Sequence, residues 1–428
     1  MASSRERQTG DGTDHIGSSS AQIVNIGAYP ADGSRMGPIA TDTARWTGAG
    51  TSSARDAREA GTAAATAALA AGVEAQLLVV FASDGYDLTA LLDGVREVAG
   101  DVPLVGCSTA GEIASSGAGD HSVVVMALGG PGFSVSTAAA SAHDLGLREA
   151  GALVAGAAAA VAHKPHQVLL LLSDGLAGDQ QEVVRGAYSV VGATVPLVGG
   201  CAGDDLRMVR TSQLHRDHVL TGFVVAAAIG SDAPLGIGVE HGWRRVGEPM
   251  LVTDSEGTCV RTLDDQPALD VYLSRLGAPA EAHTDPAAFT RFALTHPLGL
   301  SRRSGEEVRM VAEADFATRS LSCIAAVPRG GLAWIMEGDE QSVLEATDAA
   351  CRSALDALDG RPPLGLLAFD CIARRGVLGD AGIAREVQRI ATHAGTAPVS
   401  GFYTYGEIAR SSAAGGFHNQ TLVVLAVS

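Results

Sequence analysis

The sequence is poor in aromatic residues, in charged residues and in clustered cysteines. Aromatic side chains make up 4% and charged side chains 18% of the 428 residues. The 30 lysines and arginines face 48 acidic residues and form no basic cluster. A formal net charge of −18 would repel a phosphate backbone and an anionic membrane alike. We therefore expect no nucleic-acid partner and no membrane insertion.

The six cysteines include no C-x-x-C pair and have no histidines at metal-ligand spacing. A structural zinc site is not expected, and reduced, buried thiols fit the pattern better. The first 20 residues lack the apolar stretch of a secretory signal, and the longest apolar run, Ala150 to Ala162, is too short to span a bilayer. These features predict a cytoplasmic protein.

Glycine and aliphatic residues are abundant instead. Hydrophobic residues make up 46% of the chain and glycine occupies 53 positions, so we expect a globular protein packed on Ala, Val and Leu. The length is typical of two domains. Residues 1–40 lack sustained periodicity and predict a flexible tail. A boundary near Asp265 would divide the rest into domains over residues 41–265 and 266–428.

One pattern occurs three times: a strand, a loop, a helix, a short strand after proline, a glycine loop and a closing strand. The first strands are AQLLVVFASDG (75–85), HQVLLLLSDG (166–175) and PLGLLAFDCIARRG (363–376). Their aliphatic runs indicate strands buried on both faces, with the strand after each helix parallel and the closing strand antiparallel. The predicted fold is α/β, with two domains of mixed sheets covered by helices and built from repeated strand-helix-strand-strand units.

Two glycine loops, GCSTAGE (106–112) and GFYTYGE (401–407), place hydroxyl and acidic side chains after a short strand. Backbone N–H groups in such loops can bind a carboxylate, and the acidic side chains can hold an ammonium group. Together the loops predict a site for a zwitterion, while the alternative is a pair of structural turns. The candidate ligand-binding residues here are Cys107, Ser108, Thr109, Glu112, Tyr403, Tyr405 and Glu407.

A second group of candidates follows the buried first strands. Asp84 and Asp174 occupy S-D-G sequences where open α/β sheets bind ligands, and Asp370 takes the matching place in the third copy. Asp-Gly is also ordinary turn chemistry, so a turn role is equally open. Arg374 and Arg375 can grip a carboxylate bidentately or form an exposed ion pair.

An enzyme is the alternative raised by Cys107 and Cys371, which lie in or beside these loops. A hydrolase or transferase would use one of these thiols, or Ser108, as its nucleophile. Such a nucleophile needs a base, and no histidine motif accompanies either cysteine. Small buried thiols are favoured, Cys371 is kept as a ligand-binding candidate, and no catalytic residue is expected.

Several motifs in order resemble the FIST (F-box and intracellular signal transduction) family. They include LVGCSTAGEI (104–113), LVGGCAGDD (197–205), LDDQPALDVY (263–272), FDCIARRGVLG (369–379), GFYTYGEI (401–408) and HNQT (418–421), which adds Asn419 to the candidates. The resemblance implies FIST N and FIST C domains and an intracellular sensor of a small-molecule ligand, with amino acids proposed. Because the sequence stops after the last predicted strand, the expected function is a stand-alone sensor that signals through a separate protein.

The resemblance also implies an alternative, because some family members bind haem as nitric-oxide sensors. His241 and His418 lie in family-like surroundings, and a neutral imidazole can ligate haem iron. Without a C-x-x-C-H motif such a haem would be non-covalent. The main expectation has no cofactor and no metal.

Overall fold

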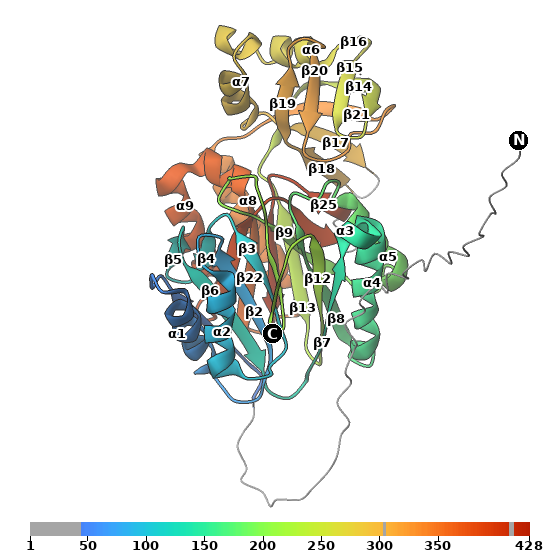
Figure 1. The fold of residues 1–428 in the computed structure, drawn as a ribbon. Coiled ribbons are helices and arrows are strands. Elements are labelled where there is room, and N and C mark those ends of the chain that lie inside the picture. The colour runs from blue at the N-terminus through green and yellow to red at the C-terminus, as the bar shows by residue number, and fades with distance from the viewer. Residues whose placement is uncertain (1–43, 303–304, 411–414) are drawn as a thin grey trace, which may run out of the picture.

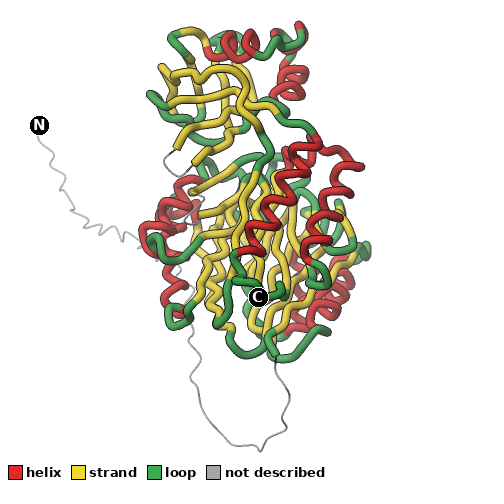
Figure 2. The backbone as a smooth tube through the Cα atoms, turned by 180° about the vertical axis from the view of Figure 1, so that it is seen from behind, coloured by secondary structure: helices red, strands yellow, loops and turns green. Residues whose placement is uncertain are grey.

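The computed structural model describes residues 44–302, 305–410 and 415–428, so the predicted N-terminal tail lies outside the described residues. Three six-stranded sheets surround a common core, and a smaller unit with its own sheet lies above them (Figure 1). Helices pack around the outside of the three sheets, as the view from behind shows (Figure 2). In the described part of the chain, no helix is long and apolar enough to cross a membrane.

The first sheet has the strand order β1-β6-β2-β3-β10-β11. Helices α1 (Ala57–Leu69) and α2 (Leu88–Ala99) pack on its outer face. Its strands are β1 (Trp46–Ser52), β6 (Val123–Gly129), β2 (Ala75–Ser83), β3 (Leu104–Thr109), β10 (Gln213–His215) and β11 (His218–Leu220).

The second sheet repeats this order as β7-β12-β8-β9-β24-β25. Its strands are β7 (Phe133–Ser141), β12 (Phe223–Ser231), β8 (His166–Asp174), β9 (Leu197–Ala202), β24 (Glu407–Arg410) and β25 (Gly415–His418). The helical segments beside it are α3 (Ala142–Leu145), α4 (Leu147–Ala155), η1 (Gly156–Val161) and α5 (Gln181–Val191).

The third sheet has the same order, β13-β26-β22-β23-β4-β5. Its strands are β13 (Leu235–Glu240), β26 (Leu422–Val427), β22 (Gly365–Cys371), β23 (Val399–Thr404), β4 (Glu112–Ala114) and β5 (Gly117–Gly119). Helices α8 (Glu340–Asp356) and α9 (Ile372–Ala394) cover it. Helix α9 starts at Ile372 and is interrupted at Gly379, where φ is 60° and ψ is 177°.

Each repeat lends a hairpin to the sheet of another repeat. The first repeat gives β4–β5 to the third sheet, the third gives β24–β25 to the second sheet, and the second gives β10–β11 to the first sheet. The inner faces of the three sheets share one apolar core, in which the Phe81 ring packs against Phe369 and Phe402. The three repeats therefore fold as one closed body.

The smaller unit lies between β13 and α8. Its strands are β14 (Arg244–Glu256), β15 (Cys259–Leu263), β16 (Gln266–Pro267), β17 (Leu298–Arg302), β18 (Gly305–Arg309), β19 (Val311–Asp315), β20 (Ser320–Cys323) and β21 (Leu332–Glu337). Helices α6 (Ala268–Arg275) and α7 (Pro286–Ala293), with η2 (Ala280–His283), complete it. The boundary predicted near Asp265 falls inside this unit, between β15 and β16.

The predicted fold class is confirmed. In every repeat the strand after the helix is parallel to the first strand, and the closing strand β6, β12 or β26 is antiparallel to it. The sheets are mixed and covered by helices, as the repeated pattern predicted.

Candidate functional site

The acidic residues of the two glycine loops are buried and hydrogen-bonded within the protein. Glu112 begins β4 and accepts hydrogen bonds from the Thr109 hydroxyl and from the backbone N–H and hydroxyl of Ser122, the latter two at 3.1 and 2.6 Å. Glu407 begins β24 and accepts from the Thr404 hydroxyl and from the Thr421 N–H at 3.1 Å. Burial raises the pKa of Glu112 to about 7 and that of Glu407 to about 8.

The second repeat places a neutral side chain at the same position. Glu112, Glu407 and Gln213 each pair with an equivalent residue of β23, β9 or β3. The Gln213 side-chain oxygen accepts the N–H of Phe223, the first residue of β12, at 3.0 Å. The two glutamates likewise accept the N–H of the residue directly before β6 or β26. The position therefore requires an acceptor oxygen rather than a charge, which favours a structural role for it. The sequence pattern did not reveal Gln213. It lies eleven positions after Ala202, the end of β9, whereas Glu112 lies only three positions after Thr109, the end of β3.

The candidate nucleophiles are enclosed. Cys107 lies in the shared core, and burial raises the pKa of the Cys107 and Cys371 thiols well above their usual range. The Ser108 hydroxyl donates to the Gly203 carbonyl at 2.7 Å and accepts the Ser212 N–H at 2.8 Å. These contacts join the glycine loops of the first two repeats and leave the Ser108 hydroxyl engaged on both sides.

The strand-end aspartates have different surroundings. Asp84 forms an ion pair with Arg207. Asp174 accepts from the Leu176 N–H at 2.9 Å and from the Thr211 hydroxyl at 2.6 Å, which is the contact pattern of a turn residue. The strand register makes Ser83, Asp174 and Cys371 equivalent. Relative to Asp174, Asp370 therefore lies one residue before the equivalent position and Asp84 one residue after it, so the three aspartates are not equivalent as the sequence predicted.

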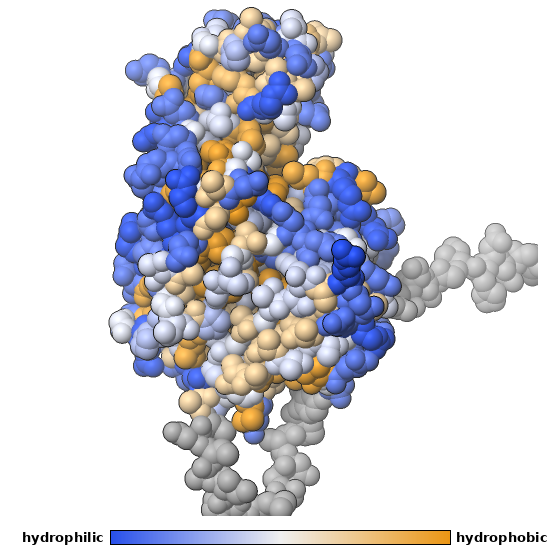
Figure 3. Space-filling model, turned by 90° about the vertical axis from the view of Figure 1, so that its left-hand side faces the viewer, coloured by the Kyte–Doolittle hydropathy of each residue, from blue (hydrophilic) through white to orange (hydrophobic). Residues whose placement is uncertain are grey.

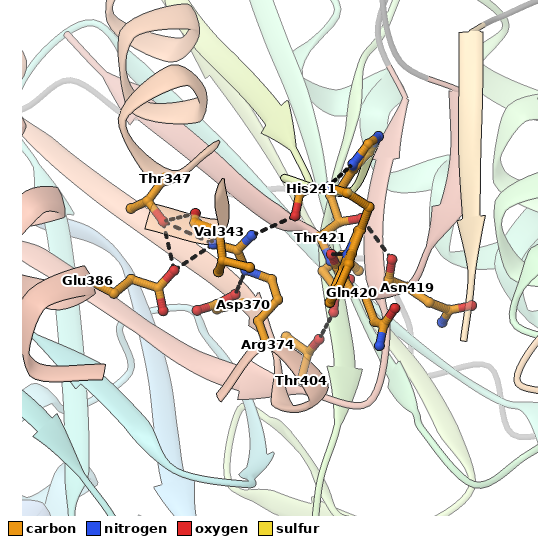
Figure 4. A network of polar contacts seen from close by, with 12 residues as sticks. His241, Val343, Thr347, Asp370, Arg374, Glu386, Thr404, Asn419, Gln420 and Thr421 are labelled. Atoms are coloured by element: carbon orange, nitrogen blue, oxygen red, sulfur yellow. Dashed lines mark hydrogen bonds and ion pairs between the residues drawn. The ribbon is translucent and has the colours of Figure 1, made fainter. Parts of the chain in front are cut away.

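This one-residue difference turns Asp370 toward the helices, where it joins a buried network around Arg374 (Figure 4). The Arg374 guanidinium donates to Asp370 at 2.7 Å, to Glu386 at 2.5 Å and to the carbonyl of His241 at 3.1 Å. Arg374, Asp370 and Glu386 side chains are completely buried. Burial and the neighbouring Glu386 carboxyl raise the pKa of Asp370 well above its usual range. Arg374 is thus placed to neutralise buried acids.

The remaining candidates from the C-terminal loop also contact the protein itself. The Tyr405 hydroxyl donates to Asp204 at 2.6 Å and accepts the Leu206 N–H at 2.7 Å. The Tyr403 ring is buried beneath the Arg375 guanidinium, whose central carbon lies 5.1 Å from the ring centroid. Asn419 is buried, and its backbone carbonyl accepts a hydrogen bond from the Thr421 hydroxyl at 2.9 Å.

The two histidines of the haem alternative are largely enclosed. His241 Nδ1 accepts the Trp243 N–H at 2.9 Å, and burial lowers the pKa of His241 to about 4. His418 Nε2 lies 3.1 Å from the Ala409 carbonyl, and burial lowers its pKa. Neither imidazole lines the clefts described next. Over the residues described, three or more His, Cys, Asp or Glu side chains nowhere gather as metal ligands would.

Two adjoining clefts lie where the three repeats meet. The larger, about 610 Å³, lies among Ala110 of the first glycine loop, Asp205 and Leu206 of the loop after β9, and α9. The smaller, about 460 Å³, continues between α9 and the β4–β5 hairpin. Figure 3 shows the side of the molecule that carries α9 and β5, with apolar side chains in the hollow below the upper unit. The residues common to both clefts are Asp120, Arg375, Asp380 and Ile383.

The clefts carry charges of both signs. Arg375 donates to the Ala110 carbonyl at 3.1 Å and forms an ion pair with Asp120. Asp205 accepts from the Ser83 hydroxyl at 3.2 Å, and burial raises the pKa of Asp205. The sequence singled out Arg375 beside Arg374 but gave no signal for Asp120, Asp205 or Asp380, because these come from three separate segments.

Apart from Arg375, the candidate ligand-binding residues predicted from the sequence do not line these two clefts. Glu112 lines a third, of about 260 Å³, on the other side of the β4–β5 hairpin. Asp84 lies next to Ser83 and is held by Arg207, beside the larger cleft's Leu206. Ligand binding by the predicted residues stays a prediction.

Comparisons with known proteins agree with the order of motifs along the chain. The model of the FIST N domain matches residues 76–266, and that of the FIST C domain matches residues 268–410. An uncharacterized protein from Methanocaldococcus jannaschii is 28% identical over 128 residues, which cover 28% of this chain and 25% of that protein. The match thus spans about a quarter of the archaeal protein's length.

Proposed function

The chain belongs to the FIST family, whose domains are associated with sensing in signal transduction, and we propose that it senses a small ligand in the cleft of about 610 Å³. The observation that carries this proposal is the position of the cleft at the junction of the three repeats. A ligand there would contact the first glycine loop, the loop after β9 and α9 at once. Ligand pockets are commonly placed at such junctions.

The side chains of the cleft suit a zwitterion with a short apolar part. Arg375 offers a guanidinium to a carboxylate, and Asp205 and Asp380 offer carboxylates to an ammonium group. Leu206 and Ile372 add apolar surface. An amino acid has this combination of groups, so the proposed ligand is an amino acid or a molecule of similar size and charge.

The proposed signal passes to a separate protein. A ligand that contacts three repeats can stabilise one arrangement of their loops, and a partner that prefers this arrangement then binds more tightly. The coupling is reciprocal, so the partner must raise the affinity for the ligand by the same factor.

A thermal-shift screen of the purified protein against the twenty amino acids tests the ligand. A ligand that binds only the folded state stabilises it by RT ln(1 + [L]/Kd), so the melting temperature rises with the logarithm of the ligand concentration once this exceeds the dissociation constant. Arg375→Gln should then weaken the ligand by about tenfold or more, since a charge-assisted hydrogen bond is lost.

Arg385→Gln is the matched control. Arg385 lies on the same helix and forms an ion pair with Glu340, but it does not line either cleft. Its substitution should leave ligand binding unchanged. If no amino acid raises the melting temperature, or if both variants weaken the ligand equally, the proposed site is wrong.

A further inference from the structure

Each of the three exchanged hairpins places one residue beside a helix, at a position that is equivalent in all three. Ala118 pairs with Ile113 in the third sheet, Phe417 with Ile408 in the second, and Val219 with Leu214 in the first. These pairs follow directly on Glu112, Glu407 and Gln213, which the strand register makes equivalent. The three positions can therefore be compared directly.

Two of the three positions are filled by apolar side chains. Phe417 is buried among the residues that α5 contributes to the outer core of the second sheet, and its N–H donates to Gln181 at 3.1 Å. Val219 packs against the corresponding cluster under α2 in the first sheet. In these two repeats the space between hairpin and helix is closed by the protein's own side chains.

The third position is open. Ala118 is exposed and stands between Gly117 and Gly119, so β5 supplies no large side chain to the space beneath α9. This space is the cleft of about 460 Å³, whose walls are β5 on one side and Asp380, Ile383 and Val387 of α9 on the other. The groove is therefore the vacant counterpart of the places that Phe417 and Val219 occupy.

The strand that borders this groove is the last strand of its sheet. In the order β13-β26-β22-β23-β4-β5, β4 is the one strand of the described residues that pairs with β5. The outer edge of such a strand presents backbone N–H and C=O groups, which proteins usually protect with charged residues or proline. Gly117, Ala118 and Gly119 provide neither, and a further cleft of about 260 Å³ lies on the opposite face of the hairpin.

The size and charge of the groove fit an extended peptide. The part of its α9 wall that follows the interruption at Gly379 runs from Asp380 to Gln388, roughly 12 Å at the rise of a helix. A strand of about four residues has this length. Asp120, Asp380 and Arg375 line the groove, so its two carboxylates outnumber its one guanidinium. A basic residue in the peptide would complement this excess of negative charge.

We infer that a segment of a separate protein adds to β5 as an extra strand along α9. An apolar side chain of that segment fills the place that Phe417 and Val219 fill in the other two repeats, and a basic side chain lies beside Asp120 and Asp380. This inference identifies a binding surface for the partner protein that the proposed function requires. The role of that partner in signalling rests on the proposed function. Because the two clefts share four residues, peptide and small ligand affect each other's affinity.

The probe is a displayed library of random dodecapeptides selected on the full chain, followed by titration calorimetry of the selected peptides. Selected peptides should share an apolar residue and a basic residue at fixed spacing. Ala118→Phe and Ala118→Val give β5 the residues of its two counterparts, so each should weaken the peptides at least tenfold. Ala118→Ser keeps the groove open and should bind them as the unchanged protein does.

Hydrogen exchange distinguishes strand addition from other binding. A bound peptide should slow exchange in the segment from Gly117 to Gly119, and urea denaturation should show that Ala118→Val leaves the fold intact. Equal peptide affinity in all three variants overturns the inference. It is also overturned if sedimentation shows a dimer of this chain that Ala118→Phe dissociates, since the occupant is then a second copy. Peptide binding is measured without small ligand, so a failed amino-acid screen does not affect this result.

Discussion

Two neighbouring arginines at the start of α9 have opposite surroundings. Arg374 is completely buried and contacts the carboxylates of Asp370 and Glu386. Arg375 faces the clefts, with its side chain 20% exposed, and pairs with the largely exposed Asp120. Successive residues of a helix point about 100° apart, which is enough to send one guanidinium into the core and the other to the surface. The same side-chain chemistry therefore serves stability at one position and is available to a ligand at the next.

The largest expected effect comes from removing the buried arginine. Arg374→Met should lower the free energy of unfolding by about 3–5 kcal/mol, because two buried carboxylates lose their cation. Arg375→Met should lower it by less than about 1 kcal/mol, since its ion pair is exposed on the Asp120 side. Urea denaturation of both variants at pH 7 measures the difference. Equal decreases in the free energy of unfolding would show that the two arginines stabilise the fold equally, whatever their burial.

A buried carboxyl that accepts hydrogen bonds from a hydroxyl and a backbone N–H, that of Glu407, sharpens this comparison. The pKa of Glu407 is about 8 in the folded protein against an ordinary value of 4.5. The folded state therefore holds a proton that the unfolded state has released, and stability falls as the pH rises from about 4.5 to about 8, by at most ~1.4 kcal/mol per pH unit. Glu407→Gln should remove this dependence and be more stable than the unchanged protein at pH 8.

Urea titrations at half-unit steps between pH 5 and 8.5 measure this effect. Glu112→Gln is the matched variant, and its effect should level off earlier, near pH 7, where the pKa of Glu112 lies. The glutamine at position 213 shows that the hydrogen bond to the closing strand is kept without a charge. A steeper fall of stability with pH in Glu407→Gln would contradict the assignment.

The converse substitution should have a smaller effect of the opposite sign. Gln213→Glu places a carboxyl where the second repeat has an amide, with Asp174 and Thr211 close by. Relative to the unchanged protein, the free energy of unfolding should change little at pH 5 and fall by roughly 1–3 kcal/mol at pH 8. At pH 8 the buried carboxyl must either ionise without water around it or keep a proton that the unfolded chain has released, and both cost free energy. Thermal melts at the two pH values test this. A variant that is equally stable at both pH values would show that the site is open to water.

Much of the fold could be predicted from local patterns. Runs such as those in β2 and β8 are long, aliphatic and followed by a turn, and these features are independent of the rest of the chain. The exchange of hairpins could not be predicted, because β4 has the same local sequence whether it pairs with its own repeat or with β23. No local pattern indicates that the smaller unit interrupts the third repeat between β13 and α8.

The candidate site was harder to predict than the fold. Glycine loops drew attention to Glu112 and Glu407, yet a carboxylate in such a loop can face a ligand or its own backbone, and the sequence does not show which. The distinction between Arg374 and Arg375 depends on a helix that starts at Ile372, inside the segment 363–376 that the repeated pattern assigned to a strand. Asp120, Asp205 and Asp380 meet only through tertiary structure, so no spacing along the chain relates them.

A third arginine gives the smallest expected effect and completes the comparison. Arg207 forms an ion pair with Asp84; the arginine side chain is 53% exposed and the aspartate side chain 9%, so the pair is open to water on the arginine side. Exposed pairs contribute little, since water and salt screen the charges and two long side chains lose freedom. Arg207→Gln should therefore lower the free energy of unfolding by at most ~1 kcal/mol, and 1 M NaCl should abolish that difference. The loop that carries Arg207 is held independently by Asp204, which accepts backbone N–H groups of Met208 and Val209 at 3.0 and 2.7 Å. Urea denaturation could instead show that Arg207→Gln lowers the free energy of unfolding as much as Arg374→Met does. The exposure of the arginine side chain would then not determine how much its ion pair stabilises the fold.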